Sequence, residues 1–231
     1  MVMFKGIVHI SKKAGYIGLI ILIVSSLTVS SASAADDSFD FLPVLKFAGG
    51  IVSSFAIHEG AHALVGGVTG TSMTWKAGDV NQPIQFTENS TSNSKGWAIN
   101  SAGLLAQMAT SEFILFNDKI DKNGSYVRGM MFWNIVNPLA YAIDYWFINK
   151  TNTIDGNTYT GDLKGIEFYS NKTTADIFTG TMVAIVAFEA YRFAKTQSWA
   201  PEWLKDKGEA EHLGLVPLAS GGALLFYTAR F

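Results

Sequence analysis

Two histidines and a glutamate in this chain have the types and the spacing of a metal centre. They are His58, Glu59 and His62, in the pattern H-E-x-x-H within residues 57–64. Two side chains four residues apart lie one turn apart on the same face of a helix, so both imidazoles can reach one ion. In zinc hydrolases of this pattern the glutamate acts as general base on a metal-activated water. The spacing therefore predicts zinc held by His58 and His62, with Glu59 as the catalytic base.

The surroundings of this motif favour a metal over the alternative, a hydrogen-bonded histidine pair without one. The chain has four histidines, and two of them lie here among apolar residues. Burying two imidazoles and a carboxylate in such a segment costs several kcal/mol unless a partner neutralises them. Cysteine is absent, so any further ligand must be His, Asp or Glu.

The composition favours a membrane protein and excludes a nucleic-acid-binding one. The 231 residues are 48% hydrophobic and only 16% charged, against a usual charged fraction of about 25%. The net charge is −2, with no basic stripe that could neutralise phosphates.

Residues 1–34 have the features of a secretory signal peptide. Lysines precede the apolar run 15–29, and the small residues 32–34 resemble a cleavage site. An uncleaved N-terminal anchor is the alternative. Residues 35–231 are then predicted to form a single domain, inserted in a membrane through the secretory route.

Apolar segments separated by polar loops predict an all-α fold, an integral, multi-pass membrane bundle of about four to five helices. Most of the segments approach the ~20 residues that cross a bilayer; a soluble helical domain is the alternative. The loop 73–95, with Pro83, is predicted to form a short extended strand or one short β-hairpin over the site. The segments are 41–68, 98–116, 127–148, 177–194 and, shorter than the rest, 213–227.

The metal motif and a later helix together resemble the site-2-protease-like membrane zinc metallopeptidases. The resemblance rests on His58-Glu59-Gly60-Ala61-His62, on the glycines that follow, and on the glycine-containing run 100–107. It implies a third metal ligand, an aspartate from a later helix, found in that family in an Asn-Pro-Asp-Gly-type sequence. Here Asn137-Pro138 is followed by Leu139-Ala140, so the aspartate is missing at that point.

The third ligand must therefore come from another acidic residue. Asp162 follows Gly161, where the backbone could approach an ion closely, and it is the preferred candidate. Asp144, in the segment 127–148, is the alternative because a carboxylate there needs a partner. Glu189 ranks behind both, since Arg192 three residues later could pair with it.

Four further residues are candidates for orienting a ligand or binding substrate. Asn100 and Gln107 lie about two helical turns apart, and Asn137 and Tyr141 one turn apart. Plain contacts between helices are the alternative for all four.

The predicted function is a membrane metalloendopeptidase with a bound Zn²⁺. Its partners would be a peptide or membrane-protein substrate and the lipid bilayer. Two other classes stay open: a non-catalytic zinc-binding membrane protein, and a helical interaction protein without metal.

Overall fold

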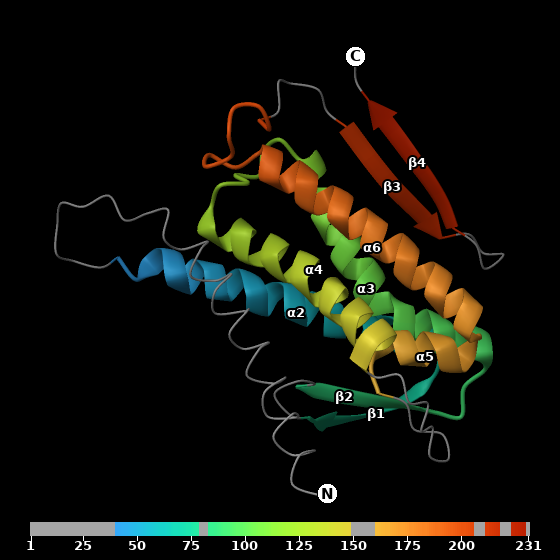
Figure 1. Ribbon diagram of the computed structural model, residues 1–231. Coiled ribbons are helices and arrows are strands. Elements are labelled where there is room, and N and C mark those ends of the chain that lie inside the picture. The colour runs from blue at the N-terminus through green and yellow to red at the C-terminus, as the bar shows by residue number, and fades with distance from the viewer. Residues whose placement is uncertain (1–39, 79–82, 149–159, 206–210, 218–222, 230–231) are drawn as a thin grey trace, which may run out of the picture. The chain divides into compact units, whose positions relative to one another are not determined.

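The fold is mostly helical, with two small antiparallel hairpins (Figure 1). The structure, a computed structural model, describes residues 40–78, 83–148, 160–205, 211–217 and 223–229. The predicted signal segment 1–34 lies outside them.

The chain divides into two compact units, 1–44 and 45–231, and the second carries the site. The elements are α2 (Leu42–Thr69), β1 (Ser72–Ala77), β2 (Ile84–Asn89), α3 (Asn93–Phe116), α4 (Ser125–Ile143), the π-helix η2 (Asp144–Ile148), α5 (Asp162–Tyr169), α6 (Lys172–Lys195), β3 (Glu211–Pro217) and β4 (Ala223–Ala229).

Helix α2 approaches α4 closely because glycines stand at the point of contact. A Cβ added at Gly50 would overlap the carbonyl oxygen of Tyr126, and one at Gly129 would overlap that of Phe47. The helix ends where Gly70 adopts a φ of +65°, a conformation that suits glycine. There Thr71 N–H donates to the Gly66 carbonyl at 2.9 Å, as in a typical C-terminal cap.

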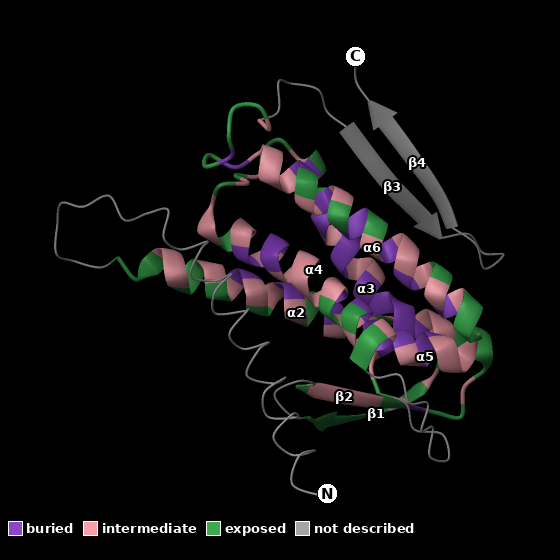
Figure 2. Ribbon diagram, viewed as in Figure 1, coloured by how far each residue is buried: buried purple, intermediate pink, exposed green. Residues whose placement is uncertain are grey.

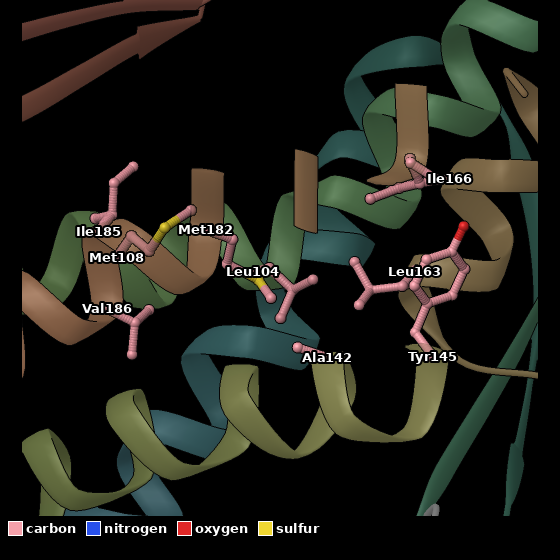
Figure 3. Close-up of a cluster of buried hydrophobic side chains, with 10 residues drawn as sticks. Leu104, Met108, Ala142, Tyr145, Leu163, Ile166, Met182, Ile185 and Val186 are labelled. Atoms are coloured by element: carbon pink, nitrogen blue, oxygen red, sulfur yellow. The ribbon is translucent and has the colours of Figure 1, made fainter. Parts of the chain in front are cut away.

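The hydrophobic core lies between α3, α4, η2, α5 and α6. Figure 3 shows Leu104 and Met108 of α3 directed toward Met182 and its neighbours on α6, while Leu163 of α5 lies beside Tyr145. These side chains are almost fully buried. Because each buried methylene contributes about 0.8 kcal/mol, this cluster holds together the helices that frame the site.

The predicted hairpin in the loop 73–95 is confirmed. Strands β1 and β2 pair antiparallel, with Ser72 opposite Asn89 and Ala77 opposite Ile84. Within this pair Trp75 faces Phe86, and their ring centroids are 5.3 Å apart. A cross-strand aromatic pair of this kind stabilises the register of a two-stranded sheet.

The prediction of a helical segment at 213–227 is wrong. Its residues form strands β3 and β4, which pair antiparallel with Leu213 opposite Tyr227. The physical reason is local, because Pro217 and the Gly221-Gly222 pair interrupt a helix and divide the segment into two short apolar runs. The fifth helix is instead the short α5, in a region predicted to be a loop.

In the part of the chain that the structure describes, only one helix is long and apolar enough to cross a membrane. That helix is α6, Lys172–Lys195. The multi-pass expectation is therefore not met by length and composition, and a single such helix is weak evidence for a membrane. Polar residues inside the other long helices, such as His58 and His62 in α2 and Gln107 in α3, lower their hydropathy.

Burial along α2 is confined to a narrow stripe (Figure 2). Large apolar side chains on the rest of the helix are exposed: Val52 by 65%, Leu64 by 66% and Val68 by 80%. Exposed apolar patches of this kind mark contact surfaces rather than ordinary solvated faces. The buried positions recur every four residues and are Gly50, Ser54, His58, His62 and Gly66.

Candidate metal centre

Helix α2 delivers both histidines of the H-E-x-x-H motif to one buried point. His58 and His62 belong to its buried stripe and are 2% and 0% exposed. Their Nε2 atoms lie 3.2 Å apart and their rings are nearly perpendicular, at 79°. The helical spacing thus produces the convergence that the sequence predicts.

Asp162 of α5 completes the group. Its Oδ2 lies 3.1 Å from Nε2 of His58 and 3.4 Å from Nε2 of His62, and the residue is 4% exposed. The preceding Gly161 has a φ of +85°, so the chain turns there in a way that disfavours other residues. This turn brings the first residue of α5 against α2, and of the two candidate aspartates it is Asp162 that lies with the histidines in the possible metal-binding group.

The hydrogen bonds at the outer edges of the imidazoles leave both Nε2 lone pairs facing inward. The carbonyl of Ile99 can only accept, and it lies 2.6 Å from Nδ1 of His62. Gln107 Oε1 accepts from Asn137 Nδ2 at 2.9 Å, so it faces Nδ1 of His58, 3.0 Å away, as an acceptor. Acceptors at both Nδ1 atoms favour the tautomer with a free Nε2, which is the form that binds metals.

Three atoms that can each bind a metal face one another and form a cradle for a cation. Asp162 Oδ2 is buried and has no hydrogen-bond partner among the described residues. Asp162 Oδ2 and the two Nε2 atoms are 3.1 to 3.4 Å from one another. Ligand atoms that bind one ion at about 2.1 Å lie about 3.0 Å apart in an octahedral site and about 3.4 Å apart in a tetrahedral one. His58, His62 and Asp162 could therefore hold a metal ion, and among the described residues they form the single such group.

The electrostatics of Asp162 keep it ionised. Burial alone would raise its pKa, but the adjacent imidazoles of His62 and His58 lower the pKa well below its ordinary value of 3.8. The aspartate is thus a charged ligand over the whole neutral range. A protonated imidazole can satisfy this charge, and a bound cation would take the place of that proton.

Glu59 lies beside the group without joining it. It is half-buried, and its Oε2 has no hydrogen-bond partner among the described residues. Its neighbour Gly60 has nothing within 4 Å of an added Cβ. A carboxylate that is close to a possible metal and not bonded elsewhere is available to accept a proton.

Gly103 of α3 is required by the approach of this helix to the two histidines. An added Cβ would lie 2.5 Å from Nε2 of His62 and 2.6 Å from Cε1 of His58. Both distances are too short for a real side chain. Glycine at this position therefore keeps open the space in which a metal would sit.

Two aromatic rings cover the imidazoles. Phe86 of β2 lies 4.6 Å from the ring of His62, and Tyr141 of α4 stacks on His58 at 6.0 Å with planes 22° apart. The hairpin β1–β2 thus lies over the site, as predicted. The two rings restrict the directions from which a ligand could enter.

The other predicted site residues have different positions. Gln107 and Asn137 form the hydrogen-bonded chain behind His58, whereas Asn100 bonds Glu88 of β2 and the Gly96 carbonyl. Asp144 opens η2 and is not part of the metal group.

Glu189 also lies outside the metal group, although it is fully buried. Arg192, its predicted partner on the same helix, binds Glu112 of α3 through Nη1, at 2.7 and 2.8 Å from the two carboxylate oxygens. The ion pair between Arg192 and Glu112 therefore joins α6 to α3.

Sequence reasoning missed three contributors to the site. These are the Ile99 carbonyl, the Gly103 backbone and the Phe86 ring. Only Gly103 carried a signal, as a glycine inside a helix. A backbone carbonyl has no residue signature at all.

Comparison of the chain with protein-family models, with curated proteins and with solved structures found no match.

Proposed function

We propose that this protein is a zinc-dependent membrane peptidase. One observation carries the proposal: Nε2 of His58, Nε2 of His62 and Oδ2 of Asp162 converge within 3.4 Å of one another. Two imidazoles and one carboxylate match the donors of catalytic zinc sites that keep a position open. The same donor set also suits ferrous iron, and Glu59 next to it favours hydrolysis.

The chain's own residues have distinct parts in this reaction. Zinc would supply an activated water and polarise the substrate carbonyl. Gln107 and the Ile99 carbonyl hold the imidazoles in the metal-binding tautomer. Glu59 takes the proton of the attacking water and passes it to the leaving amine, as general base and then general acid.

A membrane location is supported by two features of the helices. Helix α6 is long and apolar enough to span a bilayer. The apolar side chains exposed on α2, with Val68 the most exposed of them, would lie against lipid instead of water. The substrate would then be a peptide or a membrane protein that reaches the site from the bilayer.

Metal analysis of the detergent-purified protein tests the first part of the proposal. We expect near one zinc per chain in the wild type and none in His58→Ala. Iron in place of zinc, or no metal after both ions are added back, would remove the catalyst from the proposal.

Glu59→Gln separates a peptidase from a non-catalytic zinc protein. The variant is expected to keep its zinc and to lose hydrolysis of a quenched-fluorescent peptide mixture, because the amide cannot accept the proton. A zinc-loaded wild type that cleaves no peptide in that mixture would favour a structural or sensing site, which the deep burial of the three ligands also suits.

A further inference from the structure

Tyr141 packs against the hydrophobic core and also borders the possible metal centre. Its ring stacks on that of His58, with centroids 6.0 Å apart and planes 22° apart. On its edge, Cε1 lies 3.4 Å from where a Cβ of Gly161 would be, immediately before Asp162. The ring thus lies between the imidazole of His58 and the backbone of Gly161, immediately before Asp162.

The hydroxyl of Tyr141 has no hydrogen-bond partner among the described residues, and the side chain is partly exposed. Burial raises the pKa of this hydroxyl well above its ordinary value, and the carboxylates of Asp162, Glu59 and Asp144 act in the same direction. A protonated hydroxyl without a partner among the described residues, on a ring stacked against His58, can donate to a group on a bound substrate.

We propose that Tyr141 is a catalytic residue of this site, whose hydroxyl donates a hydrogen bond to the oxyanion formed on the substrate carbonyl. The inference depends on the proposed peptidase function. A phenol has an ordinary pKa near 10 and is a donor at neutral pH. Neither Glu59 nor Asp162 can fill this role, because an ionised carboxylate only accepts.

The step is balanced without a further reactant. The water oxygen bonds to the carbonyl carbon, Glu59 receives the water proton, and the carbonyl π electrons move to oxygen, where the Tyr141 hydroxyl donates without losing its proton. The carbon–nitrogen bond then breaks, and the proton on Glu59 passes to the leaving nitrogen. Removing one preorganised donor of this kind lowers kcat by about 10²- to 10³-fold in other hydrolases.

Tyr141→Phe tests the inference because it keeps the ring against His58 and removes only the hydroxyl. The matched control is Tyr126→Phe on the same helix, whose hydroxyl donates to Ser53 at 2.8 Å. Fifteen residues separate the two, about 22 Å along the helix. On one quenched-fluorescent peptide that the wild type cleaves, we expect Tyr141→Phe to lose about 10²- to 10³-fold in kcat at unchanged KM and zinc content. Tyr126→Phe should match the wild type.

Binding of a phosphinic peptide, a stable mimic of the tetrahedral oxyanion, gives a readout without turnover. Calorimetry on the zinc-loaded proteins should show about 10- to 100-fold weaker binding by Tyr141→Phe than by wild type and Tyr126→Phe. Equal kcat or equal phosphinate affinity in Tyr141→Phe would overturn the inference. So would a loss of zinc in this variant, which would make the tyrosine structural.

Failure of the peptidase proposal is a separate outcome. A wild type that binds zinc but cleaves no peptide defeats the proposed function, and the phosphinate comparison then decides whether the hydroxyl recognises an oxyanion. A wild type that cleaves peptides as fast as Tyr141→Phe defeats only the role of the hydroxyl.

Discussion

Helices α2 and α6 have similar lengths, 28 and 24 residues, but only α6 buries large apolar side chains. Helix α6 contributes Met182, Ile185 and Val186 to the hydrophobic core, where α3 and α5 pack on it (Figure 3). Helix α2 buries glycine, serine and histidine, and its large apolar side chains, such as Val52 and Leu64, are exposed (Figure 2). One helix therefore holds the bundle together and the other supplies its chemistry, so their variants should fail in different ways.

Asp162→Ala should have the largest effect on the α2 side. The variant leaves two buried imidazoles without their charged partner, and breaking a buried pair in this way typically costs about 3–5 kcal/mol. We expect zinc to be absent from the purified variant while the far-ultraviolet circular dichroism keeps its helical form. Zinc at the wild-type level in Asp162→Ala would exclude the aspartate as a ligand, and Asp144→Ala is the matched control because that residue lies outside the group.

Met182→Ala tests the α6 side. The residue is 1% exposed, and truncating a buried methionine typically lowers the free energy of unfolding by about 2–5 kcal/mol. Zinc per folded chain should not change, because Met182 contacts the core and not the ligands. Chemical denaturation measures the loss of stability, and metal analysis measures the zinc content. The control is Ile177→Ala on the same helix, where the side chain is 65% exposed. Its free energy of unfolding should be within about 0.5 kcal/mol of the wild-type value.

Gly103→Ala places a methyl group against both imidazoles of the possible metal centre. Since the new Cβ would lie 2.5 Å from Nε2 of His62, we expect the imidazoles to shift. Zinc affinity should therefore fall further in this variant than in variants that leave the three ligands in place. Competition with a zinc-binding dye measures the affinity. The control Gly60→Ala meets nothing within 4 Å and should instead stabilise α2 by about 0.5–1 kcal/mol. Equal zinc affinity in the two variants would contradict the tight approach of α3.

Gln107→Leu removes the acceptor behind His58 and should weaken zinc binding by about 10- to 100-fold. Asn137→Leu should have a smaller effect, because the asparagine acts on the histidine only through Gln107. The effects of the two should not add in the double variant, since both act through one hydrogen-bonded chain. Additive losses would show that Asn137 contacts the site by another route.

The pH dependence of the metal-free protein should reveal the charge of Asp162. Its pKa in the folded chain lies below the ordinary 3.8, so the carboxylate stabilises the fold above that pH and the contribution is lost as the pH falls toward the folded value. The difference in thermal stability between wild type and Asp162→Asn should therefore be largest above about pH 4 and should narrow steadily as the pH falls below 3.8. A constant difference down to pH 2 would mean that the carboxylate does not titrate with folding.

The sequence by itself determined the parts of the site that depend on helical spacing. His58 and His62 are one turn apart in α2, so their convergence needs no partner from elsewhere in the chain. The hairpin in the loop 73–95 was predictable for a similar reason, because its strand and turn signals are local. In contrast, local signals at 213–227 were misread as helix although Pro217 and two glycines divide that segment.

Only the tertiary structure decided which carboxylate joins the histidines. Asp144 lies within an apolar segment and Asp162 at the end of a polar loop. Gly161 favoured Asp162, but no local signal showed which of the two meets the histidines. Asp162 is chosen because Gly161 turns the chain and α5 packs on α3, which places the start of α5 against α2. The acceptors behind the imidazoles, Gln107 and the Ile99 carbonyl, come from a helix about 40 residues away, and contacts over such separations arise only when the core between the helices has formed.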